Sequence, residues 1–290
     1  MLLLKYDNRY IFEVNRILTD APDFLRDDIL EGLRAFPQNA RIAYVGLEPA
    51  AIGLHAASLT TKKARFVVFV DPRFRRRKVG TYLCRELFKD MKKLGASHAY
   101  CDFADDALTE AFVESLGMYC AFHSCLMEYC GSKMDCSIVF EAYRDEMFAQ
   151  FQALESEAFY DLRKSIGLEP FYIEPCDEYR REMADRPDDF FVYFDGDELV
   201  AAGSASAGEL DDVAVAKSHR GRGLGKQIVA HAVNKLLDSG AKAVKLWVVQ
   251  SNDIPYTLYK KLGFEEVRVH SFCLINMKSR DLKRDFAHPL

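Results

Sequence analysis

The chain has 290 residues, of which 49% are hydrophobic and 29% charged, and its formal net charge is −5. This length is long for one hydrophobic core and comfortable for two domains, and the composition is that of a soluble globular protein. The apolar start, Met1 to Leu4, meets Lys5 at once. It is too short for a signal peptide or a membrane span, so we expect no membrane partner.

Charge is divided unevenly along the chain. Residues 1–135 contain 19 Lys and Arg against 18 Asp and Glu, whereas residues 136–290 contain 20 against 26. The acidic second half favours a cationic partner such as an amine. It argues against nucleic acid, because nucleic-acid binding requires clustered basic charge.

The eight cysteines are spread over the whole chain, which favours reduced thiols in a cytoplasm over a disulfide framework. Four of them cluster at Cys120, Cys125, Cys130 and Cys136. Their spacing matches no CxxC metal pattern, and in strand-like sequence Cys acts as a small hydrophobic residue. We therefore expect a cytoplasmic protein with no metal.

A self-comparison shows that the chain repeats itself. At a shift of 145 to 146 residues, turn glycines and the hydrophobic runs between them coincide. The matched pairs are Val70 with Val215, Arg75 with Arg220, Gly80 with Gly225, Gly95 with Gly240, and Gly117 with Gly263. The repeat predicts a duplicated domain, with one copy over residues 1–135 and the other over residues 136–290.

In chain order, the second copy predicts seven elements. They are a helix over 140–164, a hairpin over 190–206, a strand over 210–215, a helix over 225–239, a strand over 243–249, a helix over 254–262 and an extended segment over 267–277. The helix 225–239 has one apolar face and ends at Gly240, and Asp195-Gly196-Asp197 is a hairpin turn. This order predicts an α/β fold with a mixed sheet covered by helices on both faces.

The predicted strand ending at Val215 runs through a loop with three glycines into the next helix. Such a loop directs several backbone N–H groups to one point at the positive end of a helix, and glycine permits close approach and positive φ. The loop is therefore either an anion cradle that fits a pyrophosphate or an ordinary turn with a glycine cap.

Residues 140–277 contain two motifs at which the chain resembles the GCN5-related N-acetyltransferase (GNAT) superfamily. The first is Arg220-Gly221-Arg222-Gly223-Leu224-Gly225, directly after the strand. The second is Asn252 followed by Tyr259-Lys260-Lys261-Leu262-Gly263-Phe264. The resemblance implies two tandem GNAT-like domains, similar in plan to mycothiol synthase, with an active second copy.

The resemblance also implies roles for single residues. The loop residues Arg220, Gly221, Arg222, Gly223, Leu224, Gly225 and Lys226 would bind the pyrophosphate of acetyl-CoA. The strand residues Val213, Ala214 and Val215 would offer main-chain groups to the pantetheine arm, because this strand splays from its neighbour. Asn252 would contact the cofactor, and Tyr259 would protonate the departing thiolate, as a phenol can once it is close and partly desolvated.

An acceptor amine must lose a proton, to water or to a carboxylate. Related family members carry bases at positions that correspond here to Asp211 and Glu209. Residues two apart on a strand share a face, so these two side chains can point into one cleft. There they could remove the proton, or they could bind a cationic substrate without removing it. A solvated acidic turn is the other interpretation. Asp212 is expected to face the other way with a structural role.

Three further side chains are interpreted as structural. His219 and His231 lack an acidic partner at triad-like spacing and are expected at the surface. Trp247 is expected to pack in a buried strand.

The first copy serves as an internal control. At the same shift, Gly223 corresponds to Lys78, Asp211 to Phe66, Glu209 to Ala64 and Tyr259 to Val113. The scaffold glycines persist while the chemical groups are replaced, so we expect a degenerate, non-catalytic domain. Its basic run, Arg75 to Lys78, has two interpretations. It binds the phosphates of CoA through side-chain charge, or it is a solvated basic surface.

We therefore expect an acyl-CoA-dependent N-acetyltransferase that acts on a primary amine of a small molecule or peptide. The alternative is a non-catalytic CoA-binding regulatory or scaffold protein, which would not require Tyr259 or Asp211. A tandem aminoacyl or peptidyl transferase is a third reading, but the basic surface is small for charged tRNA. A homodimer is compatible with the sequence, which fixes neither the acceptor nor the acyl chain.

Overall fold

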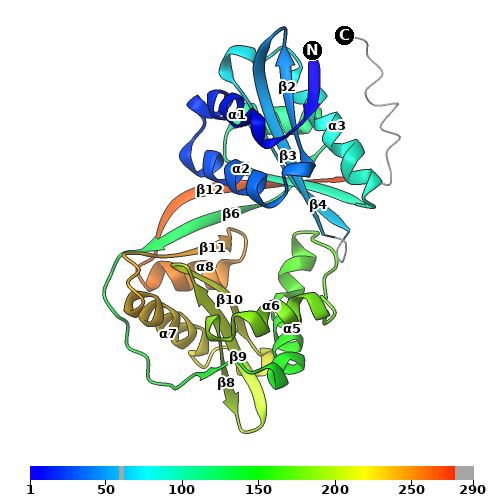
Figure 1. Cartoon of the computed structure of the whole chain (residues 1–290). Helices are drawn as coiled ribbons and strands as arrows, with labels where there is room; N and C mark the ends of the chain where they lie inside the picture. Colours follow the sequence, from blue (N-terminus) through cyan, green and yellow to red (C-terminus); the bar gives the residue numbers. More distant parts are fainter. Residues whose placement is uncertain (59–61, 278–290) are drawn as a thin grey trace. The chain divides into compact units, whose positions relative to one another are not determined.

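The computed structural model describes residues 1–58 and 62–277, and in it the chain divides into two units (Figure 1). Among the described residues, unit 1 comprises Met1–Cys120 and 272–277, and unit 2 comprises Ala121–Ser271. Each unit has a mixed sheet with helices on both of its faces, as the sequence predicts.

Unit 1 contains the sheet β1-β2-β3-β4-β5-β12. Its strands are β1 (Leu2–Lys5), β2 (Ala40–Val45), β3 (Glu48–Ser58), β4 (Lys63–Val70), β5 (His98–Ala104) and the end of β12 (Glu265–Asn276). Its α-helices are α1 (Ile11–Ile17), α2 (Asp23–Ala35), α3 (Val79–Lys93) and α4 (Ala107–Ser115). Short 3₁₀ turns are η1 (Asn8–Tyr10), η2 (Leu18–Asp20), η3 (Pro37–Asn39) and η4 (Pro72–Phe74).

Unit 2 contains the sheet β12-β6-β11-β10-β9-β8-β7. Its strands are β6 (Tyr119–Tyr129), β7 (Glu141–Ala142), β8 (Phe190–Asp195), β9 (Glu198–Ser206), β10 (Glu209–Val215), β11 (Val244–Val249) and the first part of β12. Its α-helices are α5 (Phe148–Ser165), α6 (Asp177–Asp185), α7 (Leu224–Asp238) and α8 (Asp253–Lys261). The 3₁₀ turns are η5 (Asp145–Met147), η6 (Pro187–Asp189) and η7 (Lys217–His219).

The ends of these units differ from the ends of the sequence repeat. β6 closes the first copy in sequence, yet from Ala121 on it belongs to unit 2 and pairs antiparallel with β11. β12 closes the second copy, yet its last residues belong to unit 1, where the Met277 N–H donates to the Ser97 carbonyl (2.8 Å). The chain therefore passes between the units twice, once within β6 and once within β12.

Strand pairing repeats between the units with the shift found in the sequence. In unit 2, Glu209 pairs in parallel with Lys245, and in unit 1, Ala64 pairs in parallel with Ala99. Glu209 lies 145 residues after Ala64, and Lys245 lies 146 residues after Ala99. The common register confirms that the two units are copies of one fold.

The two faces of the unit 2 sheet bury different side chains. Along β9, Ala201 and Ala205 pack under α7, whereas Val200 and Ala202 pack under α5 and α6. This alternation is the period of two that a strand imposes. The apolar face predicted for 225–239 is buried in α7, through Ile228, Val229, Ala232, Val233 and Leu236.

Two expectations about elements are wrong. The helix expected over 140–164 begins only at Phe148, because the preceding residues pair with β8 instead, and the Tyr143 N–H donates to the Phe190 carbonyl (3.1 Å). Trp247 is 38% exposed and lies beside the His270 ring (4.8 Å between centroids). β11 buries only every second residue. The continuous apolar run in its sequence therefore predicted more burial than the strand has.

Gly203 of β9 lies tightly between α7 and β8. A Cβ added there would lie 2.8 Å from Phe191 Cζ and 2.9 Å from Ile228 Cγ2. Because both neighbours are core side chains, we predict that Gly203→Ala lowers the free energy of unfolding by about 1–3 kcal/mol. Urea denaturation measures it, and the exposed Glu198→Ala on the same strand, expected within about 0.5 kcal/mol of wild type, is the control. An unchanged midpoint for Gly203→Ala would contradict the packing described.

Candidate functional site

Strands β10 and β11 separate soon after they meet. They are paired in parallel at Glu209 and Lys245, next to a hydrogen bond from the Lys245 N–H to the Gly208 carbonyl (2.9 Å). Beyond this point β10 keeps pairing only with β9. The later residues of β10 therefore have one edge of main-chain groups that does not bond β11.

β10 also contains a bulge. Asp211 pairs with Ser204 and Ala214 pairs with Ala202, so that two residues, Asp212 and Val213, oppose the single Gly203. Asp212 has a φ of +54°, in the left-handed region that non-glycine residues rarely adopt. In unit 1, β4 pairs with β3 without such an interruption.

The glycine loop leads from β10 into α7. Gly221 and Gly223 have φ values of +79° and +84°, and an added Cβ on either would meet nothing within 4 Å. The first N–H groups of a helix have no acceptor within it, so the start of α7 presents free donors at the loop. The side chain of Arg220 braces the loop by donating to the carbonyls of Val215 (3.3 Å) and Ala158 (3.2 Å).

His219 does not lie on the surface as expected. It is buried, its Nε2 lies 3.1 Å from Asp195 Oδ2, and its Nδ1 lies 2.8 Å from Ser218 Oγ. The acidic partner is the last residue of β8, which sequence spacing could not reveal. His231 is half-buried on α7 against the rings of Phe140 and Phe191 (4.8 and 4.6 Å).

The corresponding loop of unit 1 follows the same backbone path with different side chains. Arg76 and Lys78, at the positions of Gly221 and Gly223, have φ values of +61° and +60°. Lys78 is the residue that precedes α3, as Gly223 precedes α7. The left-handed turns therefore persist in unit 1 where the glycines do not.

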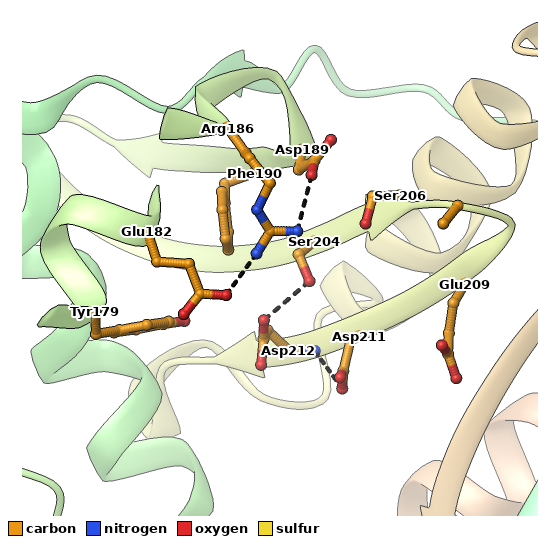
Figure 2. A pocket seen from close by; sticks show the side chains of 11 residues that line it. Tyr179, Glu182, Arg186, Asp189, Phe190, Ser204, Ser206, Glu209, Asp211 and Asp212 are labelled. Atoms are coloured by element: carbon orange, nitrogen blue, oxygen red, sulfur yellow. Dashed lines mark hydrogen bonds and ion pairs between the residues drawn. The ribbon is translucent and has the colours of Figure 1, made fainter. Parts of the chain in front are cut away.

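An acidic pocket of about 230 Å³ opens between α6, β9 and β10 (Figure 2). Its lining consists of Tyr179, Glu182, Arg186, Asp189, Phe190, Ser204, Ser206, Ala207, Glu209, Asp211 and Asp212. Five of these residues are acidic and one is basic. Arg186 pairs with Glu182 (2.6 Å) and Asp189 (3.2 Å), so its charge is already shared between two carboxylates.

The bulge brings both neighbouring aspartates into this pocket. Asp211 and Asp212 would face opposite sides of a regular strand, but both line the pocket here (Figure 2). The expectation that Asp212 faces away is therefore wrong, and the left-handed turn at Asp212 is the physical reason. Burial is the main cause that raises the pKa of Asp212 to about 6, and the charge of Asp211 adds to it.

A second buried acid lies behind the pocket. Glu155 of α5 is 8% exposed, and its Oε2 atom has no hydrogen-bond partner among the described residues. Burial, followed by the charge of Asp212, raises the pKa of Glu155 to about 7, while the charge of Arg163 and a hydrogen bond from Tyr179 partly offset this. Two acids of unit 2 therefore titrate close to neutral pH.

The sequence did not single out the α6 residues that line the pocket. Tyr179 and Glu182 come from this short helix, and Arg186 follows its end. A signal was present: Asp177 and Glu178 suit a first helical turn, and Tyr179 and Met183 are four residues apart on one face.

Of the predicted catalytic residues, Asp211 lies within electrostatic reach of both Tyr259 and Glu209. The Tyr259 side chain is 5% exposed and lies beside Phe264 (5.8 Å between ring centroids). Burial, and then the charge of Asp211, raises its pKa well above that of a free phenol. Glu209, at the start of β10, is exposed, yet partial desolvation of its carboxyl group, and then the charge of Asp211, raise its pKa.

The remaining predicted cofactor residues lie at the end of β10 and directly before α8. Val213 and Val215 pack with the core under α7, and Ala214 packs under α5. Asn252 is half-buried and directly precedes α8, where its carbonyl accepts from the Tyr256 N–H (3.1 Å). No side-chain hydrogen bond of Asn252 caps this helix.

Over residues 1–58 and 62–277, no cluster of three or more His, Cys, Asp or Glu side chains has an arrangement that could hold a metal ion. None of the eight cysteines forms a disulfide bond. Among the described helices, none combines the length and the apolar character that crossing a bilayer requires.

The sequence matches the profile of the Acetyltransferase (GNAT) family at residues 20–118 and again at residues 148–264. It is 24% identical over 228 residues to the uncharacterized N-acetyltransferase YobR of Bacillus subtilis, which covers 69% of this chain and 92% of the relative. It is 34% identical over 90 residues to a mycothiol acetyltransferase of Corynebacterium efficiens, covering 29% of this chain and 30% of the relative.

Solved structures share the fold over almost the full chain. A GCN5-related N-acetyltransferase from Sphaerobacter thermophilus superposes with a TM-score of 0.73 at 15% identity and covers 94% of this chain and 95% of its own. A tandem GNAT protein from the clavulanic acid biosynthesis pathway gives 0.63 at 13% identity, with coverages of 94% and 98%.

The buried Glu155 makes stability depend on pH. Because its folded-state pKa is raised, its contribution to stability is complete below about pH 4.5 and is lost as pH rises through about 7. Glu155→Gln does not have this loss, so we predict that the variant is more stable than wild type near pH 8. The free energy of unfolding of the variant minus that of wild type should rise by on the order of 3 kcal/mol from pH 5 to pH 8. Urea denaturation at both pH values measures it.

The matched control is Glu157→Gln, at an exposed position of the same helix. It should show no pH-dependent gain. An equal gain in both variants, or none in Glu155→Gln, would rule out a raised pKa of Glu155.

Proposed function

Because the chain belongs to the Acetyltransferase (GNAT) family and is therefore an acyltransferase, we propose that it transfers an acetyl group from acetyl-CoA to a primary amine of a small molecule or peptide by direct attack. The family as a whole uses acetyl-CoA as its donor. The observation that carries the proposal for this chain is the separation of β10 from β11 beside a glycine loop, with an acidic pocket next to it.

The loop fits a pyrophosphate. Its two left-handed glycines leave open space where a Cβ would stand, so phosphate oxygens can approach the backbone closely. The N–H groups of Leu224, Gly225 and Lys226 begin α7, where the helix dipole also favours an anion. Residues 220–226 would hold the diphosphate, and Val213 to Val215 would lie along the pantetheine arm, with Asn252 beside the cofactor.

The pocket fits a cationic acceptor. Its five carboxylates exceed its one guanidinium, so an ammonium group is attracted to the place where its proton must be removed. One of the β10 carboxylates, for which Asp211 and Glu209 are the sequence-based candidates, would receive that proton. Bound acetyl-CoA supplies a thioester carbonyl as the electrophile.

Tyr259 would return a proton to the leaving sulfur. Burial keeps its phenol protonated, and the same dry environment raises the basicity of a thiolate next to it. The buried position of Tyr259 on α8, together with its electrostatic contact to Asp211, supports this role.

Unit 1 would have no catalytic part. At the positions of Asp211 and Glu209 it has Phe66 and Ala64, which are buried core residues. Lys78 would project its side chain from the position of Gly223, where the pyrophosphate approaches. These replacements support one acetyl-CoA site per chain.

We predict that Gly223→Lys lowers acetyl-CoA affinity at least about tenfold, because the side chain enters the anion cradle while the backbone keeps its path. Lys78 already has a positive φ at the equivalent position, so the variant should fold. Titration calorimetry measures affinity and stoichiometry. The reciprocal Lys78→Gly is the control and should leave both unchanged, with one site per chain. Unchanged affinity in Gly223→Lys would place the diphosphate elsewhere.

We predict that Tyr259→Phe lowers kcat by about 10–100-fold and changes acetyl-CoA affinity little, because it removes only a proton donor. CoA thiol release with a panel of amines (a diamine, an aminoglycoside, an amino acid amide and a peptide) measures turnover. Tight acetyl-CoA binding without turnover on any amine would favour a non-catalytic CoA-binding protein.

A further inference from the structure

We propose that Asp212, and not Asp211 or Glu209, takes the proton from the acceptor ammonium, and that Asp211 holds the β10 bulge in place. This assignment rests on the proposed acetyl transfer to an amine. The sequence points instead to Asp211 or Glu209 as the base and to a structural role for Asp212.

The geometry of the bulge distinguishes the two aspartates. Asp212 is half-buried, lines the pocket, and accepts a hydrogen bond from Ser204 Oγ (2.9 Å), which fixes its carboxylate (Figure 2). Asp211 is exposed, and its Oδ1 accepts the backbone N–H of Asp212 (2.9 Å). An Asp side chain that satisfies the N–H of the next residue stabilises the left-handed turn at that residue.

Several groups face Asp212 from the elements packed around it. They are Asp211 on β10, Ser204 on β9, Glu182 and Tyr179 on α6, and Glu155 and Arg163 on α5. Burial, Asp211 and Glu182 raise the pKa of Asp212, whereas Ser204 and Arg163 lower it, and the balance lies at about 6. At neutral pH the carboxylate is therefore ionised, yet it is a stronger base than an ordinary Asp.

The neighbouring carboxylates of Asp211 and Glu182 give a reason why Asp212 takes a proton readily. Both repel the negative charge of Asp212 in a half-buried place. Protonation of Asp212 removes its own charge and so relieves the repulsion. Glu209 differs because it is exposed at the start of β10, where the charge of Lys245 offsets that of Asp211.

The proton balance of the step is complete. The ammonium gives one proton to Asp212, and the freed nitrogen lone pair forms the bond to the acetyl carbonyl carbon. The carbon–sulfur bond breaks with its electron pair on sulfur, and the thiolate takes the phenol proton of Tyr259. The nitrogen loses a second proton, which restores the phenol, and Asp212 releases its own to solvent. The products are the N-acetyl amine, CoA thiol and one proton.

The experiment measures kcat/KM against pH for the intact protein with acetyl-CoA and the best acceptor of the amine panel. We expect the pH profile of wild type to have an acidic limb, in which kcat/KM rises with pH and reaches half of its plateau near pH 6. Asp212→Asn should lose on the order of 100-fold in kcat at neutral pH, lose this limb and recover towards alkaline pH, where free amine is present. Its acetyl-CoA affinity should stay close to that of wild type.

Two further variants give opposite shifts that a merely structural role would not produce. Asp211→Asn removes a like charge but keeps an amide oxygen for the Asp212 N–H, so the limb should move to lower pH. Ser204→Ala removes a hydrogen bond to the carboxylate, so the limb should move to higher pH. Thermal unfolding verifies that each variant is folded.

Turnover by Asp212→Asn with the wild-type limb, or loss of the limb in Asp211→Asn or Glu209→Gln instead, would overturn the assignment while acetyl transfer stands. A wild-type protein that binds acetyl-CoA but acetylates no amine would overturn both the assignment and the proposed function.

Discussion

The departure of β10 from regular strand geometry is the constraint on which the candidate site depends. A strand that paired with β11 along its whole length would leave no free main-chain edge for a cofactor, and without its bulge it would present only one of two neighbouring aspartates to the pocket. Both features follow from backbone geometry, since parallel pairing ends after Glu209 and Asp212 adopts a positive φ. Gly203, opposite the bulge, leaves room there for Phe191 and Ile228.

Unit 1 shows what the same fold looks like without these features. Its β4 has the equivalent register but no bulge, and Arg65, at the position of Leu210, pairs with Asp28 and Asp102 (2.8 and 2.9 Å). The left-handed turns of its loop persist with Arg76 and Lys78. Non-glycine residues in this region carry strain of about 1 kcal/mol or more. Unit 1 therefore keeps the loop path at a cost that Gly221 and Gly223 avoid in unit 2.

The carboxylates of Glu155 and Asp212 in unit 2 lower the stability of the fold, but their raised pKa values suit proton transfer. Glu155 is buried and Asp212 is half-buried, and the charge of Asp212 raises the pKa of Glu155. Burial of a carboxylate without a full set of partners is unfavourable, and such groups occur where a raised pKa is useful. Arg163, whose Nη1 atom is buried without a hydrogen-bond partner in the part of the chain that the structure describes, compensates only in part.

The sequence by itself determined the duplication, the glycine loop and most elements of the second copy, because glycine positions and hydrophobic periods are local signals. It missed α6 and placed the start of α5 too early. It also singled out Tyr259 and Asp211, which the structure brings within electrostatic reach. Only the tertiary structure decided the orientation of Asp212, the partner of His219 and the burial of Glu155. Each depends on residues distant in sequence or on a bulge that breaks the period of two, and alternation along one strand cannot reveal either.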